Sequence, residues 1–414
     1  MGTAGSSNRT IPSPSISADP MHAPRLVLRL VVVATLTTAA GIGVLGGELA
    51  SPGKTRATRE VVSGERGEPR NCVTRATLST WSNERLAMQT IAVPVEENSL
   101  GAATSAVREG AGGLLLFGSS APSNLAAEIS RLERHDVPGG LGLIVMTDEE
   151  GGEIQRMANL VGSLPWPRWM AEHWTTAEIT RHVEAVARAM ATNGVNADLA
   201  PVVDVDGRDV LPGPSDPDGV RSFGGSTAVV SRDGVAYMRG LTEGGVIAVL
   251  KHFPGLGGAS GNTDDEAAHT LPWPELKKVA LPAFEAGIRA GVPGVMVSNA
   301  TVPGLAKYPA SLSRAAVHAL VHTLGFKGLV MTDSLSAVAI SAAGFTLPEA
   351  AVQALVAGED MILYSLYKTQ SATNAEATAM ATAIVSAVND GHLPRSRLLA
   401  AATAVLAARH RTCS

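Results

Sequence analysis

The amino-acid sequence predicts an α/β protein, a single (β/α)8 TIM-type barrel. Eight short apolar or β-branched runs alternate along the chain with longer segments that favour helices. Within each run the hydrophobicity is continuous, which is typical of parallel strands covered by helices. Only 4% of the residues are aromatic, whereas Ala and Gly are frequent. This composition suits helices packed closely against strands.

The expected elements follow one another in regular order along the chain. Strands are expected over residues 88–95, 112–118, 141–148, 197–205, 246–253, 293–300, 328–335 and 360–365. Helices fit between them, for example over residues 125–134, 176–193, 313–324 and 348–357. A doubly wound open sheet would show the same alternation of strands and helices.

Closure into a barrel is favoured by the residues that follow the strands. In a barrel the C-terminal strand ends form one rim, and active sites lie at that rim. Polar and ionisable residues gather at these ends: Asp148 to Glu150, Asp204, Asp206, Lys251, His252, Ser298, Asn299, Asp333 and Ser334. Any one of them could cap a turn, but turn capping explains the whole set poorly.

Three segments precede the predicted barrel. Residues 1–24 are rich in Ser and Pro and are expected to form a disordered tail. Residues 25–50 combine Arg25 and Arg29 with an uncharged apolar run, which predicts a signal peptide or a membrane anchor. Residues 51–71 have the composition of a linker, and the barrel domain is expected over 72–414. The protein is therefore expected to be exported, either secreted or anchored to the outer face of the cell membrane.

Charge and cysteine content narrow the choice of partners. The formal net charge is only -5 at pH 7 and the basic residues are scattered, so nucleic acid is not an expected partner. Membrane contact is expected only through the N-terminal segment, and the oligomeric state stays open. Cys72 and Cys413 are the two cysteines. The first and last elements of a closed barrel are neighbours, so a disulfide between them is expected, the alternative being two unpaired thiols.

The segment 251–257 places a cation and an imidazole, Lys251 and His252, at the end of an expected strand. It resembles a motif of the family 3 glycoside hydrolases, and within them of the single-domain β-N-acetylhexosaminidase-like branch. That motif reads Lys-His-(Phe or Ile)-Pro-Gly-(His or Asn)-Gly, four residues, then Asp-(Ser or Thr)-His; the first five residues and Gly257 match. The resemblance extends over several blocks from about residue 88 to 357. It implies a retaining β-glycosidase that acts on a carbohydrate substrate without a cofactor, N-acetylglucosamine-containing glycans being one candidate class.

The same resemblance implies five sugar-binding residues. Residues 148–156 (DEEGGEIQR) resemble the family's D-x-E-G-G-x-V-x-R, whose first Asp and last Arg contact sugar hydroxyls, here Asp148 and Arg156. Arg221 matches the arginine of the family's R-S-F block, and Lys251 and His252 match its Lys-His pair. Charged groups make strong, directional bonds to vicinal hydroxyls. A purely structural ion pair is the alternative for Asp148 and Arg156.

The block over residues 325–335 (GFKGLVMTDSL) resembles the family segment whose Asp is the catalytic nucleophile, here Asp333. A carboxylate at a strand end can attack the anomeric carbon and form a glycosyl-enzyme, which water releases with retention of configuration. Without the flanking match, a helix N-cap would explain this Asp equally well. The resemblance therefore assigns Asp333 as the nucleophile.

The family pattern breaks at the group that protonates the leaving oxygen. In this branch that group is the last His of the motif, oriented by the Asp two residues before it, but the aligned residues here are Asp264 and Asn262. Asp264 is expected to take over as acid/base, with its pKa raised by burial or by Asp265 or Glu266. His269 is the second candidate, because the Gly-rich loop allows movement. The third alternative is a catalytically impaired barrel that binds glycans without hydrolysis.

Other classes of site are less favoured. A pure binder has no need of Asp333, and a phosphate-handling barrel would place an anion where Asp333 would oppose it. No metal site is expected, since His318 and His322 have helical ligand spacing but lack a third ligand. The aspartates of residues 204–218 lack the register of a calcium loop, so a solvated loop is expected there.

Overall fold

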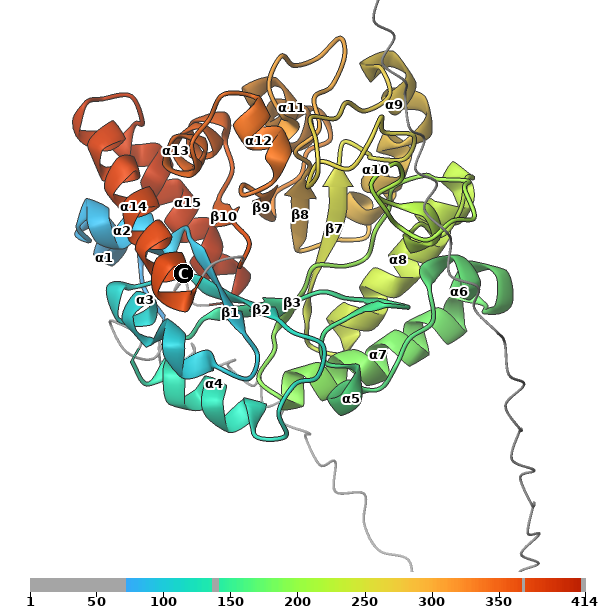
Figure 1. Cartoon of the computed structure of the whole chain (residues 1–414), viewed down its shortest axis with the longest axis horizontal. Helices are drawn as coiled ribbons and strands as arrows, with labels where there is room; N and C mark the ends of the chain where they lie inside the picture. Colours follow the sequence, from blue (N-terminus) through green and yellow to red (C-terminus); the bar gives the residue numbers. More distant parts are fainter. Residues whose placement is uncertain (1–71, 136–140, 367–368, 411–414) are drawn as a thin grey trace, which may run out of the picture. The chain divides into compact units, whose positions relative to one another are not determined.

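The computed structural model describes residues 72–135, 141–366 and 369–410. Eight strands pair in parallel, each with its neighbour in the sheet order β1-β2-β3-β6-β7-β8-β9-β10 (Figure 1). Their bounds are β1 Ala92–Glu96, β2 Gly113–Phe117, β3 Ile144–Thr147, β6 Ala197–Asp198, β7 Ile247–Phe253, β8 Gly294–Val297, β9 Leu329–Ser334 and β10 Met361–Leu363. The N–H of Ile362 donates to the carbonyl of Thr90 at 2.8 Å, so the two edges of the sheet meet. The predicted (β/α)8 barrel is confirmed.

Helices surround this sheet, and a short hairpin follows β3. The hairpin consists of β4 (Glu149–Gly151) and β5 (Ile154–Gln155). The helices are α1 Arg75–Ser79, α2 Asn83–Gln89, η1 Leu100–Ala103, α3 Thr104–Glu109, α4 Leu125–Glu133, α5 Ala158–Val161, α6 Pro167–His173, α7 Thr176–Thr192, η2 Gly219–Arg221, α8 Thr227–Glu243, α9 Trp273–Val279, α10 Leu281–Arg289, η3 Ala310–Leu312, α11 Arg314–His318, η4 Ala319–Thr323, α12 Val338–Ala342, α13 Leu347–Ala357, α14 Gln370–Asn389 and α15 Arg395–Ala408. Helix α7 begins at a capping box between Thr175 and Glu178, which satisfies two backbone donors at once.

All eight observed strands are shorter than expected, and for two of them the local sequence explains the difference. The strand expected over 88–95 begins only at Ala92, because Ser82 caps α2 and this helix continues to Gln89. The strand expected over 197–205 is regular only at Ala197–Asp198. Pro201 has no N–H to donate, so it interrupts the ladder there.

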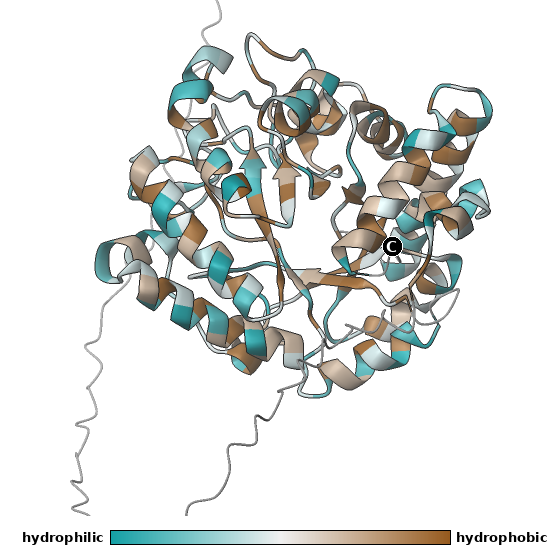
Figure 2. Cartoon of the chain, turned by 180° about the vertical axis from the view of Figure 1, so that it is seen from behind, coloured by the Kyte–Doolittle hydropathy of each residue, from teal (hydrophilic) through white to brown (hydrophobic). Residues whose placement is uncertain are grey.

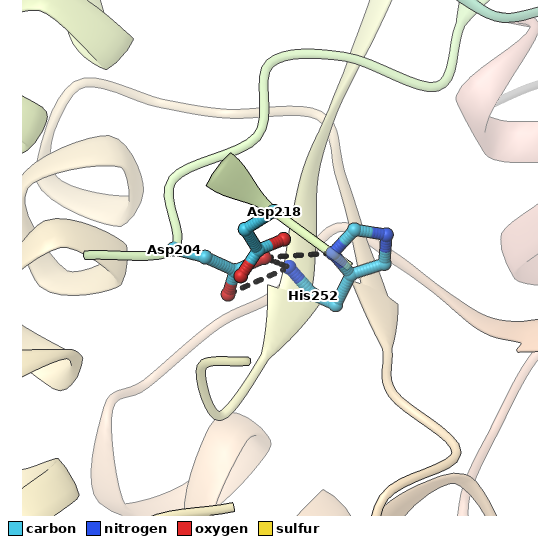
Figure 3. Close-up of side chains that lie close together, drawn as sticks. All are labelled: Asp204, Asp218 and His252. Atoms are coloured by element: carbon cyan, nitrogen blue, oxygen red, sulfur yellow. Dashed lines mark hydrogen bonds and ion pairs between the residues drawn. The ribbon is translucent and has the colours of Figure 1, made fainter. Parts of the chain in front are cut away.

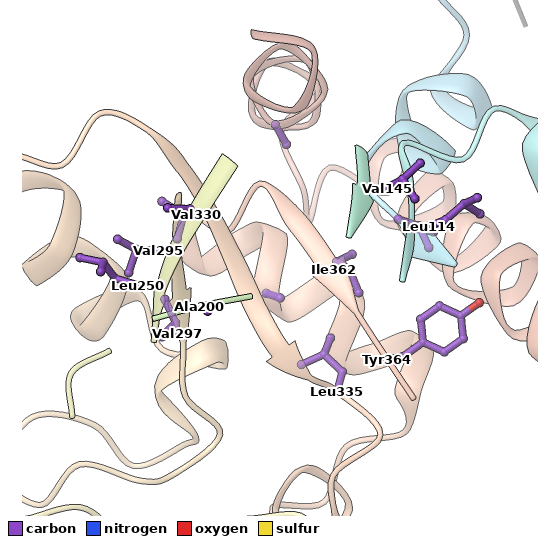
Figure 4. Packing of buried hydrophobic residues seen from close by; sticks show 14 of the residues in the cluster. Leu114, Val145, Ala200, Leu250, Val295, Val297, Val330, Leu335, Ile362 and Tyr364 are labelled. Carbon is purple, nitrogen blue, oxygen red and sulfur yellow. The ribbon is translucent and has the colours of Figure 1, made fainter. Parts of the chain in front are cut away.

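The hydrophobic core has two layers, separated by the wall of the barrel. Side chains alternate across a strand, so Leu329 and Met331 of β9 point into the barrel while Val330 points out toward the helices. The inner layer draws on every strand: Ala92, Leu115, Ile144, Met146, Ala197, Val249, Met296, Leu329, Met331, Met361 and Leu363. The outer layer fills the space under the helices, as the labelled side chains of Figure 4 show. The brown strands and the teal outer helix faces of Figure 2 reflect this division.

The structure describes neither terminus of the chain. The predicted segments 1–24, 25–50 and 51–71 lie outside the described residues, as does Cys413. The described start and end of the domain are adjacent, because α15 packs against α2 and Arg395 donates to the side chain of Asn83 at 3.0 Å. Among the described helices, none is both long enough and apolar enough to cross a membrane.

Candidate active site

A cavity of about 260 Å³ opens at the C-terminal ends of the strands. All seven residues that the sequence assigned to catalysis or sugar binding line it: Asp148, Arg156, Arg221, Lys251, His252, Asp264 and Asp333. Apolar side chains complete the wall, among them Leu115, Phe117, Leu199, Leu256, Met296 and Leu363. A larger cavity of about 590 Å³ lies at the opposite end of the barrel, where it is lined by residues such as Leu143 and Ile247. The ionisable groups therefore identify the smaller cavity as the candidate site, hereafter the pocket.

Two cations on one side of the pocket are held by a single buried carboxylate, Glu150. Arg221 donates to it from Nε and from Nη2, both at 2.8 Å, which is a bidentate pair. The Nζ of Lys251 lies 2.5 Å from the same carboxylate and 2.8 Å from the Oδ1 of Asp148. Although burial raises the pKa of Glu150, the charges of Arg221 and Lys251 outweigh it and hold that pKa well below its usual range. The three groups thus remain fully charged within one wall.

Glu150 is a residue of the pocket for which the sequence predicted no role. It is the Glu of the D-x-E-G-G block and lies between Asp148 and Arg156 in the sequence. A buried cation requires a partner, so the prediction that Arg221 and Lys251 share a pocket could have led to this carboxylate.

Arg156 lies at the other side of the pocket. Its Nη2 is 3.9 Å from the Oδ2 of Asp148, and its guanidinium lies 5.9 Å from the ring centroid of Phe117. The Asp148 to Arg156 pair is therefore long, whereas the Asp148 to Lys251 pair is close. Arg156 keeps donors directed to the pocket, as a sugar contact requires.

Asp333 stands at the end of β9, half-buried, with its carboxylate in the pocket. The backbone N–H of Ser334 donates to its Oδ1 at 2.7 Å. Asn299 holds the same turn, because its Nδ2 donates to the carbonyl of Ser334 at 2.7 Å and its Oδ1 accepts from Ser311 at 2.7 Å. Burial raises the pKa of Asp333; the nearby His252 opposes this increase, and the negative charge of Asp264 adds to it.

Asp264 reaches the pocket from the loop after β7. Its side chain is solvent-accessible at the mouth, yet it lines the pocket, so the protein displaces part of its water. This partial desolvation raises the pKa of Asp264; Arg221 opposes the rise, and Asp265 and Asp148 add to it. The backbone N–H of Asp264 donates to Asn262 at 3.1 Å, and Ala339 of α12 donates to the carbonyl of Thr263 at 3.0 Å. Two electrostatically linked carboxyls, Asp333 and Asp264, thus share the pocket.

His269, the alternative acid/base, is placed differently. It is absent from the residues that line the pocket, and its side chain is exposed. Its Nδ1 lies 3.1 Å from the carbonyl of Thr270, and its backbone is fixed to Ser260 by bonds at 2.9 and 3.0 Å. The geometry thus favours Asp264 over His269.

His252 lies against two buried aspartates, Asp204 and Asp218 (Figure 3). The Nδ1 of His252 is 2.7 Å from the Oδ2 of Asp204, and one potential ligand atom from each of the three residues lies within 4.8 Å of the others. The sequence predicted no functional role for either aspartate. Carboxylate oxygens and imidazole nitrogens are ligand types that a divalent cation can use. The spacing of these three residues along the chain did not reveal that they form a cluster.

The expectation of a solvated loop over residues 204–218 is wrong for four of its aspartates. Asp204, Asp206, Asp216 and Asp218 are all buried, with exposed fractions between 0% and 4%. Charge pairing explains part of this burial, because Arg208 bonds both Asp206 and Asp216. Tertiary packing of this kind leaves no periodic pattern in a Gly- and Pro-rich loop.

His318 and His322 are the histidine pair that has helical ligand spacing in the sequence. The rings of His318 and His322 lie with their centroids 4.5 Å apart, on α11 and η4. Among the described residues, no third ligand joins them, since the one group with metal-ligand geometry is the Asp204, Asp218 and His252 cluster.

A closed barrel with paired carboxyls and clustered cations at its C-terminal strand ends is the architecture of a barrel enzyme. The model of the glycosyl hydrolase family 3 N-terminal domain matches residues 89–408. The chain therefore belongs to glycoside hydrolase family 3, as its motifs indicated.

Curated relatives point to one branch of that family. The beta-hexosaminidase LpqI of Mycobacterium tuberculosis is 36% identical over 266 residues, which are 62% of this chain and 66% of that protein. The chain thus matches just under two thirds of that relative's length. An uncharacterized secreted glycosyl hydrolase of Arthroderma benhamiae is 31% identical over 292 residues, 68% of this chain and 80% of that protein.

Solved structures agree with this placement. The chain superposes on M. tuberculosis LpqI with a TM-score of 0.73 at 32% identity, covering 83% of this chain and 98% of that one. For the β-N-acetylhexosaminidase of Beutenbergia cavernae the TM-score is 0.71 at 29% identity, with 80% and 98% covered. Both comparisons cover the barrel almost completely.

Proposed function

We propose that this protein is an exported retaining β-glycosidase that hydrolyses glycans containing N-acetylglucosamine. The observation that carries the proposal is the pocket itself, in which the two carboxyls of Asp333 and Asp264 face the cations of Arg156, Arg221 and Lys251. The names of LpqI and of the B. cavernae enzyme support the amino-sugar substrate. The apolar run in residues 25–50 and the secreted relative support export.

Binding is proposed to involve a single terminal sugar residue. The cavity of about 260 Å³ is slightly smaller than the usual range of ligand pockets, which is about 300 to 1,000 Å³. The carboxylate of Asp148 and the guanidinium of Arg156 offer an acceptor and donors to vicinal hydroxyls, and Lys251 and Arg221 add charge-assisted donors. The apolar wall, including Leu199 and Leu363, fits the C–H faces of a sugar ring.

The first chemical step requires one of the two carboxyls, Asp333 or Asp264, to be protonated and the other to be ionised. The N–H of Ser334 stabilises Asp333 as a carboxylate, whereas no donor among the described residues bonds the carboxyl of Asp264. Burial raises the pKa of both carboxyls, and the N–H of Ser334 opposes that rise at Asp333, so the proton is assigned to Asp264 as the acid. Asp333 attacks the anomeric carbon; Asp264 gives its proton to the glycosidic oxygen, and the leaving group departs as an alcohol.

The second step restores both groups. The Asp264 carboxylate takes a proton from water, the water oxygen bonds the anomeric carbon, and the bond from that carbon to Asp333 breaks. Two inversions give net retention, and Asp264 is protonated again for the next cycle. All atoms come from the glycoside and one water molecule, so no cofactor is required.

The test uses a panel of nitrophenyl β-glycosides, including the N-acetylglucosaminide, with the wild-type protein, Asp333→Ala and Asp209→Asn. Asp209 is an exposed aspartate outside the pocket and serves as the matched control. The proposal expects release by wild type and by Asp209→Asn, with a loss of about 10³-fold or more for Asp333→Ala. A catalytically impaired binding protein would instead bind the sugar with equal, negligible release from all three.

A further inference from the structure

Behind His252 lies a pair of buried carboxyls that the mechanism above does not use. Asp204 follows β6, and Asp218 immediately precedes η2. Both side chains have an exposed fraction of 0%. Figure 3 shows their carboxyls side by side, with the second ring nitrogen of His252 pointing away from both.

Two carboxylates this close cannot both carry a charge in a buried place without compensation. The charged groups that face the pair are Arg221 of η2, Asp206 and His252. The guanidinium of Arg221 is committed elsewhere, because it bonds both oxygens of Glu150 and the carbonyl of Pro217. Compensation must therefore come from a shared proton or from a bound cation.

The hydrogen bonds indicate which carboxyl holds the proton. The Asp204 carboxylate accepts from the N–H of Leu256 at 2.7 Å, from the backbone N–H of His252 at 3.1 Å, and lies 2.7 Å from its Nδ1. Burial raises the pKa of Asp204 to about 7, but these N–H donors oppose the rise and favour its ionised form. Neither oxygen of Asp218 has a hydrogen-bond donor among the described residues. The proton thus belongs on Asp218, and burial together with the charge of Asp204 raises the pKa of Asp218 well above its usual range.

We propose that Asp218 is a protonated positioning residue, whose carboxyl O–H donates to Asp204 and thereby fixes the tautomer of His252. The Asp204 carboxylate accepts the Nδ1–H of the imidazole, so Nε2 carries no proton and faces the pocket as an acceptor. Nε2 then accepts a hydrogen bond from a sugar hydroxyl, a last step that rests on the proposed function. Burial and the charge of Arg221 lower the pKa of His252 to about 4, which agrees with a neutral ring.

A neutral ring has a consequence for the nucleophile. His252 stands beside Asp333 in the pocket, and an imidazolium there would form an ion pair with the attacking carboxylate. The neutral tautomer leaves the negative charge of Asp333 available for the anomeric carbon. Asp218 would thereby act on catalysis only through Asp204 and His252.

The test compares Asp218→Asn with Asp218→Ala in the full chain. The amide of Asn donates to Asp204 as a carboxylic acid does, whereas Ala removes the donor and leaves the Asp204 carboxylate incompletely bonded. Nitrogen-15 NMR of histidine-labelled protein reports the tautomer of each ring, and the His252→Gln spectrum identifies the His252 resonance. We expect a neutral, Nδ1-protonated ring in wild type and in Asp218→Asn, and a changed protonation pattern in Asp218→Ala.

Kinetics on the glycoside hydrolysed best by wild type provide the second readout. Asp218→Asn should keep kcat/KM within about threefold of wild type, and Asp218→Ala should lose about tenfold to a hundredfold, the scale of a misplaced binding group. Asp209→Asn, in the same loop, should change neither the spectrum nor the rate. The NMR readout does not depend on turnover. If the protein hydrolysed no glycoside, the spectra would still report the tautomer of His252, so failure of the proposed function can be distinguished from failure of this inference.

Two outcomes would overturn the inference. One is an imidazolium or an Nε2-protonated His252 in wild type at neutral pH. The other is stoichiometric binding of Zn²⁺, Mn²⁺ or Ca²⁺, titrated as the chloride salts into chelator-treated protein, that Asp218→Asn abolishes. In that case a cation rather than a proton would join the two carboxyls.

Discussion

The ammonium of Lys251 and the carboxylate of Glu150 lie 2.5 Å apart, and their side chains are only 3% and 1% exposed. Arg221 shares the same carboxylate. One acidic side chain therefore positions two of the cations that are proposed to bind the sugar.

Replacing Glu150 with Ala should destabilise the protein, because it leaves two buried cations without their shared partner. Breaking a buried ion pair costs about 3–5 kcal/mol. Urea unfolding of wild type, Glu150→Ala and the exposed-site variant Asp209→Ala measures the effect. An unfolding free energy for Glu150→Ala equal to that of Asp209→Ala would contradict the role given to Glu150.

Replacing each candidate acid with Ala should show whether Asp264 or His269 protonates the leaving group. Asp264→Ala should lower kcat about 10² to 10⁴-fold for a glycoside with a poor leaving group, because general acid catalysis contributes on that scale. The loss should be smaller for a nitrophenyl glycoside, and azide should restore turnover by replacing water in the second step. His269→Ala should retain wild-type activity, since its exposed side chain lies outside the pocket. The reverse pattern would assign the acid to His269.

Raising the pH from acidic to mildly alkaline values should weaken the fold through two buried carboxyls, Glu149 and Asp198. Burial, reinforced for Glu149 by the charge of Asp198, raises the pKa of each to about 8, and one oxygen of each has no hydrogen-bond partner. A carboxyl with a raised folded-state pKa contributes stability below its unfolded pKa and loses it as the pH rises through the folded value. The unfolding free energy of wild type should therefore fall as the pH rises from about 4, where these carboxyls ionise in the unfolded chain, to about 8, where they ionise in the folded protein.

Asp198→Asn provides the matched variant for this pH dependence. Its amide cannot ionise, so the fall between about pH 4 and 8 should be smaller than in wild type. Nearby charges on Asp148, Glu150 and Lys251 are present in both proteins and cancel in the comparison. Identical slopes for the two proteins would show that Asp198 does not hold a proton at neutral pH.

A disulfide between Cys72 and Cys413 remains a prediction from the sequence. The packing of α15 against α2 supports it, because it brings the described ends of the domain together. Peptide mapping under non-reducing conditions should recover the two cysteines in one linked peptide pair. Reduction should lower the unfolding free energy by about 2–5 kcal/mol. Recovery of both cysteines as free thiols from protein exported to an oxidising compartment would contradict the prediction.

The barrel and the assigned residues of the pocket could be predicted from the sequence because both depend on local patterns. Continuous apolar runs marked all eight strands, and the residues just after them meet at one rim, which is why Asp148, Lys251 and Asp333 were found together. Contacts between residues that are distant in the chain could not be predicted from the sequence. Asp218 contacts Asp204 and His252 only because the loop folds back, and nothing in a Gly- and Pro-rich segment records that path.

Trapping the glycosyl-enzyme tests the central claim most directly. Incubation with a 5-fluoro N-acetylglucosaminyl fluoride, followed by proteolysis and mass spectrometry, locates the carboxylate that bonds the anomeric carbon. The expected result is one stoichiometric adduct on the peptide that contains Asp333, absent from Asp333→Ala. An adduct on another carboxylate, or hydrolysis of the reagent without any adduct and with inversion, would contradict the account.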